Sequence, residues 1–407
     1  MERIDSAAAA KLGRGELARR LTGVVAEVLT ELALQLNQRE QRELVTLLLD
    51  DMLGLGPLEP LLADDSINDI LVNGASQVFV ERRGRLERTD VTFRDNAHVM
   101  AVVTRIVTQI GRRVDEASPL VDARLADGSR VNIIIPPLAL DGPSISIRKF
   151  SKMSIDLDRM ATQGNLAPAM ATVLKIAARC RLNILISGGT GSGKTTLLNA
   201  MSQLIGADER IVTIEDAAEL QLQQPHVVRL ETRPANLEGK GEINMRDLLK
   251  NALRMRPDRI ILGEIRGQEA IDMLQAMNTG HDGSLGTIHA NRPREALTRL
   301  ENMVAMAGFN LPVAAVRTQI AAAVHMVVQI ARMRDGVRRI TSITEIAGIE
   351  GDTIVLKELF AYHLDDGAAQ TAAGAVRGGF ECSRLRPHFS PRAAYYGLDA
   401  ELAAAMA

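Results

Sequence analysis

The chain has 407 residues, and its 48 lysines and arginines nearly balance its 50 aspartates and glutamates, so the formal net charge is -2. That balance, with aromatic residues at 2% and no tryptophan, makes nucleic acid an unlikely partner, because neither a whole-chain attraction to phosphates nor a platform for base stacking is present. The two cysteines, Cys180 and Cys382, lie far apart in no metal-like spacing, which argues against a disulfide framework or zinc and fits a reducing compartment such as the cytoplasm.

The first part of the chain predicts helices. Residues 1–14 are alanine-rich and polar, and we expect them to be loose. Leucines and valines recur at helical spacing over 17–36, and a second apolar stripe over 44–52 ends before a glycine and a proline. We interpret residues 1–58 as an N-terminal helical segment, which is either a small bundle or, for its first helix, a solvated arm. The start lacks the apolar core of a signal peptide, and no apolar run reaches the roughly 18 residues of a membrane span.

Short strands and one helix follow. The strands are expected at 69–72, 78–81, 121–125, 130–135 and 144–150, and the helix at 96–110. Asp127-Gly128 favours a hairpin turn between two of these strands. We therefore predict a small α+β domain over 59–150 and read the polar residues 151–160 as a linker.

From residue 161 onward, apolar runs alternate with helical patterns, which is typical of a largely parallel sheet covered by helices. Candidate strands lie at 182–187, 210–215, 226–230, 259–263, 284–288 and 324–330. Beyond residue 331, Asp335-Gly336 joins two β-rich runs, and an alanine- and glycine-rich tail closes the chain. We predict one α/β domain over 161–407.

The segment 182–196 carries the clearest chemical signal. Gly188, Gly193, Lys194 and Thr195 fit the pattern G-x-x-x-x-G-K-[ST] between a buried strand and a helix, the context of a P-loop rather than of a chance glycine turn. Glycines let backbone N–H groups turn toward an anion, and the helix start adds partial positive charge. We predict ATP and Mg²⁺ as ligands, with Lys194 on the β/γ-phosphates and the Thr195 hydroxyl on the metal. The predicted phosphate-binding residues are Gly189, Thr190, Gly191, Ser192, Gly193, Lys194, Thr195 and Thr196.

Two later strands each end in a carboxylate. The run 211–216 delivers Glu215 and Asp216 at its carboxyl end, where ligands bind in open α/β sheets, and a carboxylate there can orient an attacking water. The run 259–264 resembles a Walker B element, with Gly-Glu where Asp-Glu is commoner, so Glu264 would serve Mg²⁺ or the nucleophile. The alternative for Asp216 and Glu264 is a helix cap.

Several further residues are candidates for sensing the γ-phosphate. A glycine-laced loop places His281 and His289 near what we expect to be the same sheet edge, with packing or capping as the alternative. Arg254 and Arg266 flank the Glu264 strand, with surface ion pairs as the alternative.

Three arginines of the α+β domain are arginine-finger candidates. Arg124 and Arg130 bracket the hairpin turn, and Arg148 lies on the strand that leads to the linker. We hypothesise that they close on the γ-phosphate and relax on product release. The alternative is that they pair with surface carboxylates and contribute little.

Four boxes in order within 185–295 resemble the Walker A, aspartate, Walker B and histidine boxes of the type II and type IV secretion ATPases. They are Gly-Gly-Thr-Gly-Ser-Gly-Lys-Thr, Ile-Glu-Asp-Ala-Ala-Glu-Leu, Ile-Leu-Gly-Glu-Ile-Arg and Gly-Ser-Leu-Gly-Thr-Ile-His-Ala-Asn. Upstream, 121–132 and 144–150 look like the Tad/Flp pilus branch of CpaF type, which extends the likeness over most of 15–360.

The resemblance implies a RecA-like P-loop ATPase domain and a cytoplasmic homo-hexamer, with ATP sites between subunits, seated under an inner-membrane pilus platform protein. It implies that Glu215 is the catalytic base and that Glu264 serves Mg²⁺. Pilus-extension and type II secretion motors often carry a tetracysteine zinc module, which two cysteines cannot build. That favours the Tad branch or the type IV secretion ATPases.

Three functions follow from this reading. The leading one is a motor that assembles a Tad/Flp type IV pilus, with retraction left open. The second is a substrate-translocation ATPase of a type IV secretion machine. The third, a RecA-like nucleic-acid motor, is disfavoured by the neutral charge and scarce aromatics.

Overall fold

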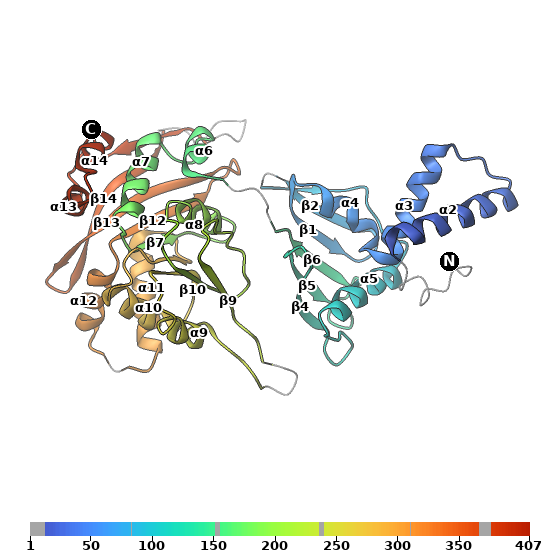
Figure 1. Ribbon diagram of the computed structural model, residues 1–407, viewed down its shortest axis with the longest axis horizontal. Coiled ribbons are helices and arrows are strands. Elements are labelled where there is room, and N and C mark those ends of the chain that lie inside the picture. The colour runs from blue at the N-terminus through green and yellow to red at the C-terminus, as the bar shows by residue number, and fades with distance from the viewer. Residues whose placement is uncertain (1–12, 83, 151–154, 236–239, 310, 366–375) are drawn as a thin grey trace. The chain divides into compact units, whose positions relative to one another are not determined.

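The computed structural model describes residues 13–82, 84–150, 155–235, 240–309, 311–365 and 376–407. The chain forms two compact units, Met1–Lys152 and Met153–Ala407 (Figure 1). Within the described ranges, no helix has the length and apolar character needed to cross a membrane.

The described part of the first unit begins with α2 (Arg14–Glu31) and α3 (Gln38–Leu53). Asn37 caps α3 through the backbone N–H of Glu40, whose carboxylate accepts from the Asn37 N–H in return. The apolar stripes of the two helices pack against each other, with Leu17 and Leu21 buried in the same cluster as Leu49. The first helix is therefore not a solvated arm. Of the residues 1–14 that we expected to be loose, 1–12 lie outside the described part, whereas Gly13 is the N-cap of α2 and Arg14 begins it.

An antiparallel six-stranded sheet forms the rest of this unit, in the order β3-β2-β1-β6-β5-β4. Its strands are β1 (Ile67–Asn73), β2 (Gln77–Arg82), β3 (Arg85–Arg88), β4 (Leu120–Arg124), β5 (Arg130–Ile134) and β6 (Ser144–Arg148). The helices are η1 (Gly56–Leu58), α4 (Glu59–Ala63) and α5 (Asn96–Gln109), and α5 buries Val99, Val103 and Ile106 in the core of the sheet. The predicted strands, hairpin and helix are confirmed, while η1, α4 and β3 carried no sequence prediction.

A nine-stranded sheet forms the centre of the second unit, in the order β15-β14-β13-β12-β7-β11-β10-β8-β9. It is parallel from β12 to β9 and antiparallel from β12 to β15. The strands are β7 (Ile184–Ser187), β8 (Ile211–Glu215), β9 (Val227–Glu231), β10 (Arg259–Ile265), β11 (Leu285–Ile288), β12 (Met326–Arg332), β13 (Arg338–Glu350), β14 (Thr353–Leu364) and β15 (Gly378–Cys382). All six strands predicted after residue 161 are present.

Helices cover both faces of this sheet, as α/β proteins require (Figure 1). One core contains α6 (Leu157–Thr162), α7 (Pro168–Arg179), α8 (Lys194–Ser202), α13 (Ser390–Tyr395) and α14 (Asp399–Ala405). The other contains α9 (Met245–Ala252), α10 (Glu269–Asn278), α11 (Pro293–Met306) and α12 (Val313–Ala323). Alternate residues of β7 serve the two cores, with Ile184 and Ile186 in one and Leu185 in the other.

This unit corrects one sequence expectation and gives structure to one segment that carried no prediction. Residues 157–160 of the expected linker belong to α6, which Asp156 caps and whose Leu157 and Met160 are buried, while 151–154 lie outside the described residues. The tail also has defined structure. The buried carboxylate of Glu345 accepts the backbone N–H groups of His388 and Phe389 at 2.6 and 2.7 Å, which fixes the start of α13 on the sheet.

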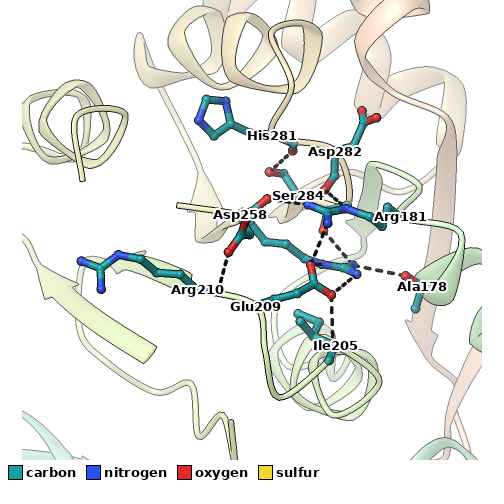
Figure 2. Close-up of polar contacts among 12 residues, drawn as sticks. Ala178, Arg181, Ile205, Glu209, Arg210, Asp258, His281, Asp282 and Ser284 are labelled. Atoms are coloured by element: carbon teal, nitrogen blue, oxygen red, sulfur yellow. Dashed lines mark hydrogen bonds and ion pairs between the residues drawn. The ribbon is translucent and has the colours of Figure 1, made fainter. Parts of the chain in front are cut away.

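A buried ion pair fixes the amino ends of the central strands. Arg259, at the start of β10, is 2% exposed and donates to both carboxylate oxygens of Glu209 at 2.7 and 2.8 Å, and to the carbonyl of Ala178 at 3.2 Å. Figure 2 shows Glu209, Ala178 and Arg181 converging on this point. The contact ties β10 to the loop before β8 and to the end of α7, so the strands that carry Glu264 and Glu215 start from one anchored edge.

Candidate active site

The glycine loop 188–193 connects β7 to α8 and has the backbone of a phosphate cradle. Gly191 and Gly193 adopt left-handed φ values of 68° and 100°, which favour glycine. A Cβ on Gly188 would lie 2.4 Å from the carbonyl oxygen of Ile330 and 2.5 Å from Ser192 Oγ, so this position admits no side chain. The loop therefore fits a bound polyphosphate, with its backbone N–H groups and the start of α8 as the binding elements.

Lys194 begins α8 and folds back over the loop. Its Nζ donates to the carbonyls of Gly188 and Gly189 at 3.0 and 2.9 Å. Burial lowers the pKa of Lys194, and the negative charge of Glu264 opposes that shift. This ammonium group lies within its own cradle, where a phosphate would meet it, and Glu264 is near enough to influence it.

Glu215 ends β8 and is 3% exposed. Its Oε2 accepts the backbone N–H groups of Glu219 and Leu220 at 2.7 and 3.0 Å, whereas no donor among the described residues reaches Oε1. Burial raises the pKa of Glu215 to about 7, against the opposing effect of those two hydrogen bonds and of Arg229. A carboxylate with a pKa near the working pH is suited to accept a proton from water.

Gly263 explains why Gly-Glu replaces the commoner Asp-Glu in this chain. Gly263 lies on β10 beside Glu215 on β8, and a Cβ built on it would approach Glu215 Cγ to 2.8 Å. An aspartate would therefore collide with the stem of the buried Glu215 side chain. The Thr287 hydroxyl donates to the Gly263 carbonyl at 2.6 Å and fixes this backbone from β11.

Glu264 and Asp216 share one partner, Arg266. The Arg266 guanidinium donates to Glu264 Oε2 at 2.5 Å and to Asp216 Oδ2 at 2.9 Å. Arg266 thus pairs with two acids at the carboxyl ends of β10 and β8, and its single positive charge offsets one of their two negative charges. This is the ion-pair alternative for Arg266. It also connects Glu264 and Asp216 through one guanidinium.

The two candidate histidines lie at opposite ends of the strands, His281 at the amino ends and His289 at the carboxyl ends. The expectation that they share one side of the sheet is therefore wrong. His281 precedes β11 and His289 follows it, and four extended residues span about 13 Å. His281 belongs to the amino edge near Asp258 (Figure 2), where its backbone N–H donates to Ala276 at the end of α10. His289 lies beside the P-loop, because the Gly188 N–H donates to the carbonyl of the preceding residue, Ile288.

His289 also lines a cavity of about 410 Å³ at the start of α11. The other lining residues are Ala290, Asn291, Arg294, Glu295, Thr298 and Arg299. Of the two histidines, only His289 therefore retains a position consistent with phosphate sensing in its own subunit.

Arg254 is exposed in the turn between α9 and β10, at the amino ends of the strands. The P-loop lies at the carboxyl ends, and the seven residues of β10 extend over about 23 Å. Arg254 is therefore misplaced for the phosphates of its own subunit, and its sequence proximity to Glu264 was misleading.

Arg124, Arg130 and Arg148 form one row across three neighbouring strands. Arg124 is directly opposite Arg130, and Arg130 is directly opposite Arg148. Directly opposed residues share a face of the sheet, so the three side chains start from the same face. Arg148 also pairs with Asp69 at 3.1 Å. The row concentrates positive charge in the first unit.

Two residues of the candidate site were not found from the sequence. Gly263 carried only the signal of an unusual Walker B element, and Arg338 carried none. Arg338 lies on β13 and donates from Nε to the Gly191 carbonyl at 3.0 Å across 147 positions of sequence. A contact between positions so distant in the chain has no local pattern.

Residues 51–355 match the protein family described as "Type II/IV secretion system protein". A putative conjugal transfer protein of Mycobacterium tuberculosis is 41% identical over 329 residues, which cover 79% of this chain and 92% of that protein. Conjugal transfer protein TrbB of Rhizobium radiobacter is 35% identical over 293 residues, which cover 70% and 86%. The solved structure of the Legionella pneumophila ATPase DotB is 22% identical, covers 68% of this chain and 76% of that chain, and has a TM-score of 0.50, a likeness that confirms the expected fold class. With three quarters of its length matched to one family, this chain belongs to the type II/IV secretion system proteins.

Proposed function

We propose that the chain is an ATP-hydrolysing motor that drives substrate transfer in a type IV secretion machine. The observation that carries the proposal is the buried carboxylate of Glu215, whose pKa is raised to about 7. Glu215 ends β8, and the P-loop follows β7, so both lie at the carboxyl ends of parallel strands. Two similar proteins are named for conjugal transfer, which supports the secretion branch. The motor works as a homo-hexamer in the cytoplasm, held at the inner membrane by partner proteins.

Each residue of the site has a separate task in the proposed reaction. The loop N–H groups and Lys194 would hold the β- and γ-phosphates, and Thr195 and Glu264 would hold Mg²⁺ directly or through water. When bound, Mg²⁺ would offset part of the negative charge on the phosphates. Glu215 in its ionised form accepts a proton from the water that attacks the γ-phosphate.

The arginine row of the first unit supplies the proposed link between chemistry and motion. Arg124, Arg130 and Arg148 are attracted to the γ-phosphate, so their unit closes on ATP and relaxes after hydrolysis. The nucleotide shifts this equilibrium only by its differential affinity for the two states, which the loss of one phosphate charge changes. His289 is the remaining sensor candidate within the second unit.

Assembly of a Tad/Flp pilus is the second candidate function. It is favoured by the segments 121–132 and 144–150, which resemble that branch and lie on the adjacent strands β4, β5 and β6. The chemistry would be the same, and the partner would be a pilus platform protein.

Two measurements test the proposals. The purified chain should hydrolyse ATP with Mg²⁺ and assemble into a ring of six subunits by native mass, and absence of ATP turnover would reject the motor. Deletion of the gene should then abolish transfer of substrate between cells while surface pili remain. Loss of pili with intact transfer would select the pilus function instead.

A further inference from the structure

The hairpin of β12 and β13 packs directly against the P-loop. β12 runs parallel to β7 with Gln329 opposite Ser187, so the next residue of β12, Ile330, lies beside the start of the loop. The Ile330 carbonyl occupies the space of a Gly188 side chain, and Arg338 Cδ would lie 3.0 Å from a Cβ on Gly193. The glycine loop is therefore shaped on one side by a distant part of the chain.

Arg338 contacts the loop at the peptide between Gly191 and Ser192. Its Nε donates to the Gly191 carbonyl at 3.0 Å. In a trans peptide the C=O of Gly191 and the N–H of Ser192 point in opposite directions. A guanidinium that holds the carbonyl therefore also sets the direction of the Ser192 N–H, which donates to the Gly189 carbonyl at 3.4 Å and lies between two glycines with left-handed φ values.

The backbone of Arg338 is itself anchored. Arg338 pairs with Arg332 across the hairpin. Its carbonyl accepts from Asn165 Nδ2 at 2.6 Å, and two residues later the Ile340 N–H donates to the Asn165 carbonyl at 2.8 Å. Asn165 follows α6 in the second unit. The Arg338 side chain that contacts the loop therefore extends from a backbone that Asn165 holds in place.

We infer that Arg338 is a positioning residue for the phosphate chain of a nucleoside di- or triphosphate, acting through the Gly191–Ser192 peptide of the P-loop. The inference deepens the proposed ATPase function and rests on it. A nucleotide with two or three phosphates uses this peptide, because its β-phosphate occupies the loop. A monophosphate does not reach into the cradle and gains little from Arg338.

The test compares Arg338→Met with Arg334→Met. Methionine keeps an apolar stem against Gly193 but lacks the donor, and Arg334 is an arginine at the tip of the same hairpin, so both variants lose one positive charge. A lost hydrogen bond with a charged donor should weaken binding of fluorescent ADP about ten-fold in Arg338→Met. Binding of fluorescent AMP should stay unchanged, and Arg338→Lys should restore part of the ADP affinity.

Each outcome decides one question. ADP affinity within two-fold of the parent in Arg338→Met, with a normal melting temperature, overturns the inference while the proposed function stands. Equal losses for ADP and AMP, or no rescue by lysine, also overturn it, because they indicate general damage to the fold. If the parent itself binds no nucleotide, and Lys194→Ala changes nothing, the proposed function has failed instead.

Discussion

Replacing Glu215 by glutamine should stabilise the protein while it removes catalysis. The pKa of Glu215 rises from 4.5 to about 7, and each pH unit between the two pKa values is worth about 1.4 kcal/mol, so the fold disfavours the ionised carboxylate by about 3 kcal/mol. Between these values the folded protein holds a proton that the unfolded chain has released, and the free energy of unfolding therefore falls as the pH rises from 4.5 to 7. Glutamine cannot ionise and escapes this loss.

The assay is urea unfolding of Glu215→Gln and the parent at pH 5 and pH 8, together with ATP turnover. At pH 8 the variant should be more stable by up to about 3 kcal/mol, and at pH 5 most of that difference should vanish. Its turnover should fall by roughly two to four decades with nucleotide affinity retained, the usual range for a lost general base. The matched control is Glu231→Gln, an exposed glutamate opposite Glu215 on β9, which should show no such pH-dependent gain. If Glu215→Gln differed from the parent in stability by the same amount at both pH values, the conclusion that burial raises the pKa of Glu215 would be refuted.

The other predictions concern the loop, the neighbouring strand and the arginine row. Lys194→Ala should abolish ATP turnover and weaken nucleotide binding while the ring still assembles, so normal steady-state turnover would remove the P-loop assignment. Gly263→Ala places a methyl group 2.8 Å from Glu215 Cγ, and turnover should fall about ten-fold or more because the base is displaced, whereas an unchanged rate would show that the two strands yield without cost. Arg130→Ala and Arg148→Ala rings should lose roughly three to five decades in rate if these residues act as arginine fingers, measured with nucleotide binding and hexamer mass intact. Rates within a few-fold of the parent would leave the first unit coupled to ATP by packing alone.

The parts of the site that sequence reasoning found are those built from neighbouring residues. The P-loop was predictable because an apolar strand, a glycine pattern and a helix start follow one another between Ile184 and Lys194. His281 was misplaced for a related reason. Only eight positions separate it from His289, and a strand of four residues within that interval carries them to opposite edges.

Contacts between distant segments escaped prediction. α6 is six residues long and buries only Leu157 and Met160, too short a pattern to separate from a linker. The last helix of the tail, α14, packs against α7, which lies more than 200 positions earlier, and sparse apolar residues such as Leu398 and Leu402 join the same core. The contact of Arg338 with the P-loop likewise exists only in the folded protein, where β13 lies next to the loop.

The close approach of Gly263 to Glu215 also makes the two positions interdependent in evolution. An aspartate cannot appear at 263 while a buried glutamate fills the space beside it, because even a Cβ would lie 2.8 Å from Glu215 Cγ. The order of substitutions is then constrained: the side chain at 215 must shrink, or its strand must shift, before a second acid can enter β10. Relatives with aspartate at the position of Gly263 should therefore carry a smaller residue or a displaced strand at the position of Glu215, and each substitution made alone should be harmful in the other's background.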